Sequence, residues 1–409
     1  MYRPSEQLGV GSLILTAKEK AYVNQVLDSN RLSYGPFSQK FESDFAACHD
    51  SRFGILSNSG TSSLQVALAA LKEKYGWEEG DEILVPAITF IATSNVVIML
   101  NLKPVFVDVD PKTYNINPGL IEEKITPKTK AIIPVHMFGL PADMDTIMAV
   151  AQKHKLRVLE DSCETMFVGI NGKPVGSFGD IGCFSTYVAH FLVTGVGGLS
   201  VTNDPELAVM MRSLVNHGRD GIYLSIDDDE NKHGDELAMV VKKRFNFVRL
   251  GYSYRVTEME AALGLAQLEM KDEILAARQT NAKMLIDFLA PLEKEGYIQL
   301  PSTPDYAEHS FMLFPIVVAD PAIERDSLIL FLEEHLIETR PMMPLLNQPF
   351  YVKEFGNLEP QYPVASGLNR TGFYVGCHQG FDEQKLRYIA DTFASFFDQN
   401  SKRRPVVKS

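Results

Sequence analysis

Cysteine is scarce in this sequence. The chain has four cysteines in 409 residues, and they are far apart and form no CxxC pair: Cys48, Cys163, Cys183 and Cys377. Zinc sites and disulfide frameworks use paired or closely spaced cysteines, so neither is predicted. A reducing compartment fits this usage.

Long apolar runs are missing as well. No stretch approaches the roughly 20 apolar residues that cross a bilayer, and the first ten residues, MYRPSEQLGV, contain no signal-peptide core. We therefore expect no membrane partner and a cytoplasmic location.

Positive charge is in deficit. The chain carries 39 Lys and Arg against 52 Asp and Glu, a formal net charge of -13. Binding a nucleic-acid backbone needs the opposite balance, so nucleic acid is not an expected partner, although a small anionic substrate can still meet a local basic pocket. With 45% hydrophobic residues, a chain of this length can bury a large core, most naturally as one big domain and a smaller one.

Short apolar runs alternate with amphipathic stretches between about residues 50 and 250. This rhythm predicts an α/β fold with a mostly parallel sheet covered by helices. A helix with one buried face is expected to begin right after Gly60-Thr61, in SSLQVALAALKEKYG. The predicted strands are FGILSNSG, EILVPAITF, PVFVDVD, AIIPVHMFG, RVLEDS, IGCFSTY and GLSVTND.

Three further segments complete the predicted organisation. The charged, weakly periodic stretch 222–245 is expected to be a long surface loop or excursion. A large domain with an N-terminal arm is predicted over 1–275, and a smaller C-terminal α+β domain is predicted over 276–398. The basic, polar residues 399–409 are expected to be a disordered tail.

Two segments carry candidate chemistry. In VLEDSCETM, Asp161 ends an apolar run at the carboxyl end of a strand, where open α/β sheets place ligands. It is either a helix N-cap or a partner for the protonated ring nitrogen of a pyridoxal cofactor. In SNSGTSS, a glycine and hydroxyls precede a helix, so they either cap it or hold a phosphate at its positive end. Phe90 is either a core aromatic, which the sequence favours, or a ring that stacks on a planar cofactor.

A third segment, GSFGDIGCFSTYVAHFLVTGVGGLSVTND, makes a resemblance specific. Together with RLSYGPFSQKFESDFA, SNSGTSSL, VPAITFIATSN, KPVFVDVDPKTYNI, PVHMFGLPADMD and GYSYRVTEMEAALGLAQLE, it resembles the DegT/DnrJ/EryC1/StrS family of sugar aminotransferases and 3-dehydratases. The match runs from about residue 10 to residue 390. It implies a fold-type I homodimer with a seven-stranded sheet and with active sites at the subunit interface.

The resemblance also implies a cofactor site for pyridoxal or pyridoxamine phosphate. In it, Gly60, Thr61 and Ser185 would hold the phosphate, Phe90 would stack on the ring, and Asp161 would meet the ring nitrogen. Glu164 stands where many relatives have glutamine, near the ring hydroxyl. Ser253 stands where the family usually has an asparagine that reaches the phosphate of the neighbouring subunit.

His190 stands where the family's aminotransferases have the lysine that forms a Schiff base with the cofactor. Imidazole cannot form that bond, but it can act as a general base near neutral pH. The resemblance to the histidine-bearing GDP-4-keto-6-deoxymannose 3-dehydratases rests on the pair Ala189-His190. The sequence departs from that branch at Val188, Phe191 and Val196.

These residues lead to three hypotheses. The favoured one is C3 dehydration of a nucleotide-linked 4-keto-6-deoxy sugar with His190 as base and glutamate recharging the cofactor. A sugar aminotransferase that uses glutamate is the alternative, which includes the case that His190 is an engineered replacement of lysine. A non-catalytic cofactor or sugar sensor is the third. Arg219 and Arg340 either bind a carboxylate or the sugar diphosphate, or form ordinary ion pairs.

Overall fold

The computed structural model describes residues 2–220 and 231–401. The main sheet consists of β1 (Phe53–Ser57), β2 (Glu82–Pro86), β3 (Lys103–Val107), β4 (Thr129–Ile132), β5 (Arg157–Asp161), β8 (Ile181–Ser185) and β9 (Gly198–Thr202). Their order in the sheet is β1-β9-β8-β5-β4-β2-β3. All neighbours pair in parallel except β9, which is antiparallel to both β1 and β8. The predicted mostly parallel, seven-stranded sheet is confirmed, and each predicted strand is present.

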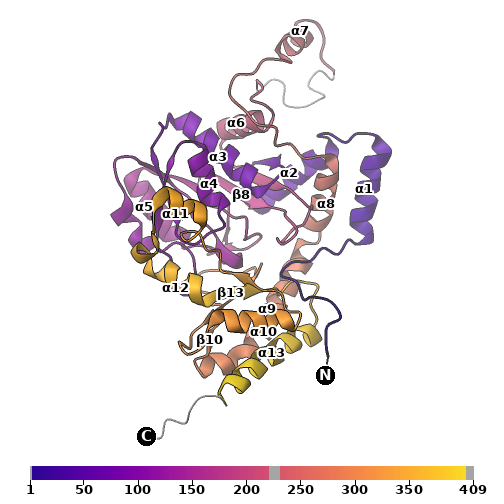
Figure 1. The fold of residues 1–409 in the computed structure, drawn as a ribbon. Coiled ribbons are helices and arrows are strands. Elements are labelled where there is room, and N and C mark those ends of the chain that lie inside the picture. The colour runs from indigo at the N-terminus through magenta and orange to yellow at the C-terminus, as the bar shows by residue number, and fades with distance from the viewer. Residues whose placement is uncertain (1, 221–230, 402–409) are drawn as a thin grey trace.

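Helices cover this sheet, so its central strands are buried on both faces and read as continuous apolar runs. Figure 1 shows these helices around the sheet, in indigo to pink. They are α2 (Pro36–Cys48), α3 (Gly60–Tyr75), α4 (Ala92–Met99), α5 (Met144–His154), α6 (Pro205–Val215) and α8 (Glu258–Leu268), and α1 (Ala17–Ser29) packs against the outer side of α8. Short 3-10 turns lie at Pro118–Leu120, Glu122–Lys124 and Met137–Gly139, and a small hairpin is formed by β6 (Gly169–Ile170) and β7 (Lys173–Pro174).

Helix α3 differs from its prediction in two ways. It begins at Gly60 rather than after Thr61, because the side chain of Ser59 accepts a hydrogen bond from the N–H of Ser62 and caps the helix there. Its first three turns are buried nearly all round, since the helix packs between the sheet, α4 and α6. Gly60 and Thr61 are therefore the first residues of the helix.

The segment 222–245 was expected to be a long surface loop or excursion, and its described part is an excursion that contains a helix. Helix α7 (Gly234–Lys243) lies within it and projects from the large sheet at the end away from the C-terminus (Figure 1). Its first turn holds Asp235 and Glu236 and its last turn Lys242 and Lys243, which is the charge order that the helix dipole favours. Residues 221–230 lie outside the described residues.

The C-terminal part has its own antiparallel sheet, β10-β11-β13-β12. Helix α9 (Lys271–Lys294) leads into it from α8 (Figure 1). Helix α13 continues to Ser401, inside the segment 399–409 that was expected to be disordered, and residues 402–409 are outside the described part. The other elements are β10 (Ile298–Gln299), β11 (Phe314–Val318), α10 (Arg325–Glu334), β12 (Arg340–Pro341), α11 (Pro349–Phe355), a 3-10 turn (Glu359–Gln361), α12 (Pro363–Thr371), β13 (Gly372–Val375) and α13 (Glu383–Ser401).

The N-terminal arm is tied to this C-terminal part. The N–H of Leu8 donates to the carbonyl of Leu336 at 2.7 Å, and the N–H of Glu338 donates back to Leu8 at 3.0 Å. Within residues 2–220 and 231–401, no helix is both long enough and apolar enough to cross a membrane.

Candidate active site

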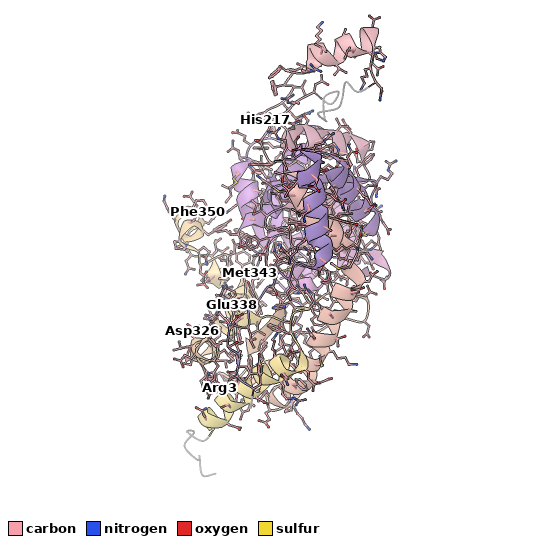
Figure 2. The ribbon with its side chains drawn as sticks, turned by 90° about the vertical axis from the view of Figure 1, so that its right-hand side faces the viewer. Arg3, His217, Asp326, Glu338, Met343 and Phe350 are labelled. Atoms are coloured by element: carbon pink, nitrogen blue, oxygen red, sulfur yellow. The ribbon has the colours of Figure 1, made fainter. Side chains whose placement is uncertain are left out.

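A cavity of about 540 Å³ lies where the large sheet meets the C-terminal part. Figure 2 labels two of its lining residues, Glu338 and Met343, midway down the molecule. The cavity brings together most of the residues singled out from the sequence: Gly60, Thr61, Phe90, Asp161, Glu164, Ser185, His190 and Arg340. No lysine is among the described residues that line it.

Asp161 is the last residue of β5 and is 3% exposed. Thr93 Oγ1 donates to its Oδ2 at 2.7 Å, and the N–H of Cys163 donates to Oδ1 at 3.2 Å. Burial raises the pKa of this carboxyl, and these hydrogen bonds oppose the rise. No helix starts at Asp161, so the N-cap alternative is wrong. A buried carboxylate in a cavity with few donors is suited to a cationic partner.

Glu164 lies three residues further on and is also buried. Its Oε2 accepts a hydrogen bond from the N–H of Phe138 at 2.9 Å. Burial raises the pKa of Glu164 to about 7, against the effect of the Phe138 N–H and with help from the nearby Asp161. Glu164 therefore exchanges a proton near neutral pH and can serve as a donor or an acceptor to a ring hydroxyl.

The N-terminus of α3 forms one end of the cavity. The first N–H groups of a helix have no partner inside the helix, so those of Gly60 and Thr61 are available to an anion. A Cβ atom on Gly60 would lie 2.7 Å from Cβ of Ser185 and 2.8 Å from Sγ of Cys163. Glycine is therefore required sterically at this point, and Ser185, at the end of β8, is placed directly beside the helix terminus.

His190 lies on the loop between β8 and β9. It is half-buried, and its N–H donates to the carbonyl of Tyr187 at 2.8 Å. Burial lowers the pKa of the imidazole to about 4; a hydrogen bond with the backbone of Ser185 opposes this, and the positive charge of Arg278 adds to it. The ring is therefore neutral at physiological pH and has the protonation state of a base.

The residues alone favoured Phe90 as a core aromatic, but Phe90 does not belong to the core. Its side chain is 58% exposed, on the loop between β2 and α4, and lines the cavity. The loop has already left the sheet at this point, so the helices that bury the strand no longer cover it. An exposed aromatic face at the cavity is available for stacking on a planar ligand.

The sequence pattern described as the DegT/DnrJ/EryC1/StrS aminotransferase family matches residues 14–394. This chain belongs to that family. A GDP-perosamine synthase of Escherichia coli O157:H7 is 34% identical over 94% of this chain and 96% of its own length. The solved E. coli GDP-4-keto-6-deoxy-D-mannose-3-dehydratase with bound hydrated PLP is 27% identical, with a TM-score of 0.85 over 95% of this chain and 99% of the other.

A further solved relative is a variant of the 3-dehydratase ColD. It is 28% identical to this chain, with a TM-score of 0.83 over 93% of this chain and 100% of the other, and it carries lysine in place of a histidine and asparagine in place of the serine before it. The histidine of ColD thus follows a serine. The pair Ala189-His190 was expected to match that branch at both residues, and this is wrong for Ala189.

Membership of the DegT/DnrJ/EryC1/StrS family confirms the fold-type I fold and makes the chain an enzyme of the pyridoxal-phosphate-dependent sugar aminotransferase and dehydratase family of deoxysugar biosynthesis. The cavity fits such a cofactor on its own evidence. The space beside Gly60 is open only because this residue has no Cβ atom. Asp161 contributes a buried carboxylate, and Phe90 contributes an exposed aromatic ring. Gly60, Thr61, Ser185 and Asp161 all line this one cavity.

Arg340 lines the cavity and forms an ion pair, as the second of the two readings from the sequence expected. Its guanidinium pairs with Glu338, and Nη1 donates to the carbonyl of Thr339 at 2.9 Å. The other carboxylate oxygen of Glu338 accepts the N–H of Val10 at 2.7 Å. Glu338 thus connects Arg340 to the N-terminal arm.

Arg219 and Ser253 do not lie in this cavity. They line a second one, of about 600 Å³, together with Arg255. Ser253 Oγ accepts a hydrogen bond from Arg255 at 3.2 Å, and Arg219 lies over the rings of Phe245 and Phe247 at 5.5 and 5.6 Å. Within one chain, neither residue belongs to the cofactor cavity.

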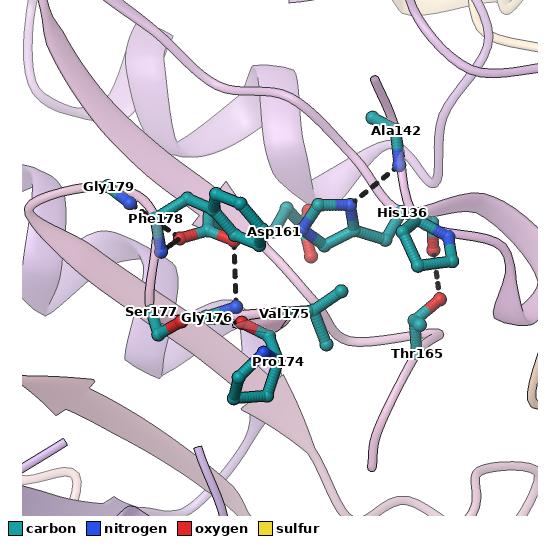
Figure 3. Close-up of polar contacts among 12 residues, drawn as sticks. His136, Ala142, Asp161, Thr165, Pro174, Val175, Gly176, Ser177, Phe178 and Gly179 are labelled. Atoms are coloured by element: carbon teal, nitrogen blue, oxygen red, sulfur yellow. Dashed lines mark hydrogen bonds and ion pairs between the residues drawn. The ribbon is translucent and has the colours of Figure 1, made fainter. Parts of the chain in front are cut away.

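His136 lies behind the cavity in a buried network (Figure 3). Its Nδ1 accepts the N–H of Ala142 at 3.0 Å, so Nε2 carries the proton toward Glu160, 3.1 Å away. Glu160 also accepts the N–H groups of Gly176, Phe178 and Gly179, each at 2.7 Å. This network connects the segment after β4 to β5 and to the loop that precedes β8.

Several cavity residues escaped the sequence reasoning. Cys163 lies in the same VLEDSCETM segment as Asp161, and Glu338 precedes Arg340 by two residues, so proximity to a chosen residue was an available signal. Val10, Gly11 and Tyr374 had no local signal, because they reach the cavity only through the folding of the chain ends.

Proposed function

We propose that this chain is a pyridoxamine-phosphate-dependent 3-dehydratase of a nucleotide-linked 4-keto-6-deoxy sugar, in which His190 is the base. The observation that carries the proposal is a cavity with a neutral histidine and with no lysine among the described residues that line it. A transaminase of the usual kind needs an amine there, whereas a general base needs only an unprotonated imidazole within reach.

In this proposal, each residue of the cavity has a separate role. Gly60, Thr61 and Ser185 would bind the phosphate, and Phe90 would hold the ring from one face. When bound, the cofactor supplies an amine that condenses with the ketone of the sugar and a ring that accepts electrons. Asp161 would keep a proton on the ring nitrogen, because a buried carboxylate favours a cation beside it.

His190 would take the proton from the C4′ carbon of the cofactor and give it to the departing C3 hydroxyl of the sugar, which leaves as water. Its lowered pKa keeps it unprotonated and ready to accept that proton across the physiological range. The products would be a 3-deoxy-4-keto sugar and ammonia, with glutamate as the amino donor that recharges the cofactor. Arg340 is proposed to hold an anionic group of one of these substrates.

An aminotransferase remains the second candidate. The perosamine synthase named above is a relative over nearly the whole chain, and Ala189 departs from the serine of ColD. In this reading His190 replaces a lysine, and the natural product would be an amino sugar.

We also propose a homodimer that completes the site. Large apolar side chains are exposed beside the cavity mouth, including Tyr187 and Val196, each 52% exposed, and Leu250 is 90% exposed near Ser253. A second subunit that covers these residues would bring Ser253 and Arg219 toward a cofactor phosphate or substrate in its partner's cavity.

The test is product analysis with a nucleotide-linked 4-keto-6-deoxy sugar, such as GDP-4-keto-6-deoxymannose, together with pyridoxal phosphate and glutamate. The dehydratase proposal expects ammonia and a 3-deoxy sugar by mass spectrometry. His190→Asn should keep cofactor binding but lower turnover by roughly 10²–10⁴-fold, the usual loss of general-base help. His190→Lys should shift the product toward an amino sugar.

A stable amino sugar as the main product of the unmodified chain would refute dehydration and favour the second candidate. If His190→Asn turns over as fast as the unmodified enzyme, His190 is not the base. If no product forms from any such sugar, both enzyme hypotheses fail and the sensor hypothesis is the one that is left.

A further inference from the structure

Arg278 is a fully buried arginine directly behind the loop that carries His190. It belongs to α9 and its side chain is 0% exposed. Nη1 donates to the carbonyls of Met312 at 2.9 Å and Phe311 at 3.3 Å, and Nη2 donates to the carbonyl of His190 at 3.4 Å. One guanidinium therefore connects the histidine loop to the segment that leads into β11.

The same loop has a second anchor on α8. Gln267 accepts the N–H of Val193 at 2.8 Å and donates to the carbonyl of Val193 at 2.5 Å. This pair of hydrogen bonds holds the loop three residues after His190. Imidazole forms no covalent bond with a cofactor, so protein contacts such as these must set the position of His190.

The charge of Arg278 is not needed for hydrogen bonding alone. Asn281, on the same helix, donates to the carbonyls of His378 and Phe381 as a neutral amide. No carboxylate hydrogen-bonds to Arg278 in the part of the chain that the structure describes. A buried cation without a counter-ion is costly, and burial lowers the pKa of Arg278 only to about 10, so it stays charged at neutral pH.

We infer that Arg278 is a positioning residue for His190, which with Gln267 fixes the histidine loop and places a fixed positive charge behind the imidazole. This inference rests on the proposed role of His190 as base. The charge disfavours the imidazolium, because like charges repel, and so keeps His190 in the form that accepts a proton. The effect adds to burial, which is the main cause of the lowered pKa of His190.

Other ionisable groups line the same cavity as His190. Carboxylates there would favour the imidazolium, whereas Arg340 acts in the same sense as Arg278. These groups are Asp161, Cys163, Glu164, Tyr187, Glu338, Arg340 and Tyr374. Because they stay unchanged when Arg278 is replaced, a comparison of Arg278 variants isolates its own contribution.

The test is NMR titration of the holoenzyme labelled at its histidine rings, with His190→Asn used to assign the His190 signal. In the unmodified enzyme, His190 should remain neutral from pH 5 to pH 8. Arg278→Gln should raise the pKa of His190 by about one unit, since it removes a like charge at close range. Arg278→Lys keeps the charge and should leave that pKa low.

Two matched controls separate charge from packing. Asn281→Ala removes hydrogen bonds from the same face of α9 and should not move the pKa of His190. Gln267→Ala loosens the loop and should lower kcat more than it changes KM, again without moving that pKa. A rise in the pKa of His190 that is as large in Asn281→Ala as in Arg278→Gln would overturn the inference.

Two further outcomes overturn it independently. One is a His190 that titrates near 6.5 in the unmodified enzyme, a measurement that needs no variant to fold. The other is a His190 pKa that Arg278→Gln leaves unchanged. None of these titrations requires turnover, so a failure of the dehydratase proposal, read from products, is distinguishable from a failure of this inference.

Discussion

His49 should make the protein lose stability in mild acid. It is fully buried among aromatic rings. The centroid of its imidazole lies 4.3 Å from the ring centroid of Phe184 and 4.8 Å from that of Phe45. Its Nδ1 lies 2.8 Å from the carbonyl oxygen of Val175, which only accepts, so Nδ1 carries the proton. Nε2 is buried and has no hydrogen-bond partner within the described ranges. Protonating Nε2 would place a cation there, and burial lowers the pKa of His49 to about 4.

The sign and size follow from proton linkage. A histidine in the unfolded chain has its ordinary pKa of about 6.5, so the unfolded state binds the proton between pH 6.5 and 4 while the folded state does not. The contribution of His49 is therefore complete above pH 6.5 and is lost as the pH falls toward 4. Between its pKa of about 6.5 and pH 5, a span of about 1.5 pH units, the unfolded histidine is protonated while the folded one is not. At about 1.4 kcal/mol per pH unit, this lowers the free energy of unfolding by about 2 kcal/mol between pH 7 and pH 5.

The perturbation is His49→Phe, which keeps an aromatic ring at this position but cannot titrate. Loss of the hydrogen bond to Val175 costs about 1 kcal/mol at every pH. Glu164 acts in the opposite sense, since its pKa is raised to about 7 and its folded form binds the proton first. The hydrogen-bond loss is the same at every pH, so it cancels when each protein's value at pH 5 is subtracted from its own value at pH 7. The Glu164 contribution is the same in both proteins, so it cancels when these two differences are compared.

The assay is urea unfolding of both proteins at pH 7 and pH 5. The decrease in the free energy of unfolding between these pH values should be about 2 kcal/mol smaller in His49→Phe than in the unmodified protein. His233→Gln, at an exposed position, is the control and should keep the full decrease. Equal decreases in His49→Phe and the unmodified protein would show that His49 is not held neutral by burial.

Three other outcomes are expected. Borohydride reduction of the holoenzyme should give no pyridoxyl-lysine adduct by mass spectrometry, because no lysine lines the described cavity; an adduct would show that a lysine reaches the cofactor. Gly60→Ala should weaken pyridoxal phosphate binding by about tenfold or more in an absorbance titration, since the new Cβ collides with Ser185, whereas Gly367→Ala, where a Cβ has open space, should bind normally. Light scattering should give the mass of a dimer, and a monomer with full cofactor affinity would contradict the shared site.

Local sequence determined the parts of this protein that depend on near neighbours in the chain. The strands of the main sheet were predictable because a strand buried on both faces needs a continuous apolar run. Gly60 and Asp161 were also predictable, since each lies at the end of an element, where backbone groups and side chains become available to a ligand. Ser185 was singled out only through the family resemblance. These three meet in one cavity because parallel strands end at the same edge of the sheet.

Tertiary structure alone decided the rest. The residues alone favoured the core for Phe90, whereas the family resemblance implied a place at the cofactor, and whether the ring is covered depends on helices elsewhere in the chain. Arg219 and Ser253 form a cavity of their own, which no spacing between them and the cofactor residues reveals. Arg278 is 88 residues from His190 in the sequence and yet donates to its carbonyl. Contacts of this kind depend on how α9 and the histidine loop pack together, and such packing leaves no periodic or compositional pattern in either segment.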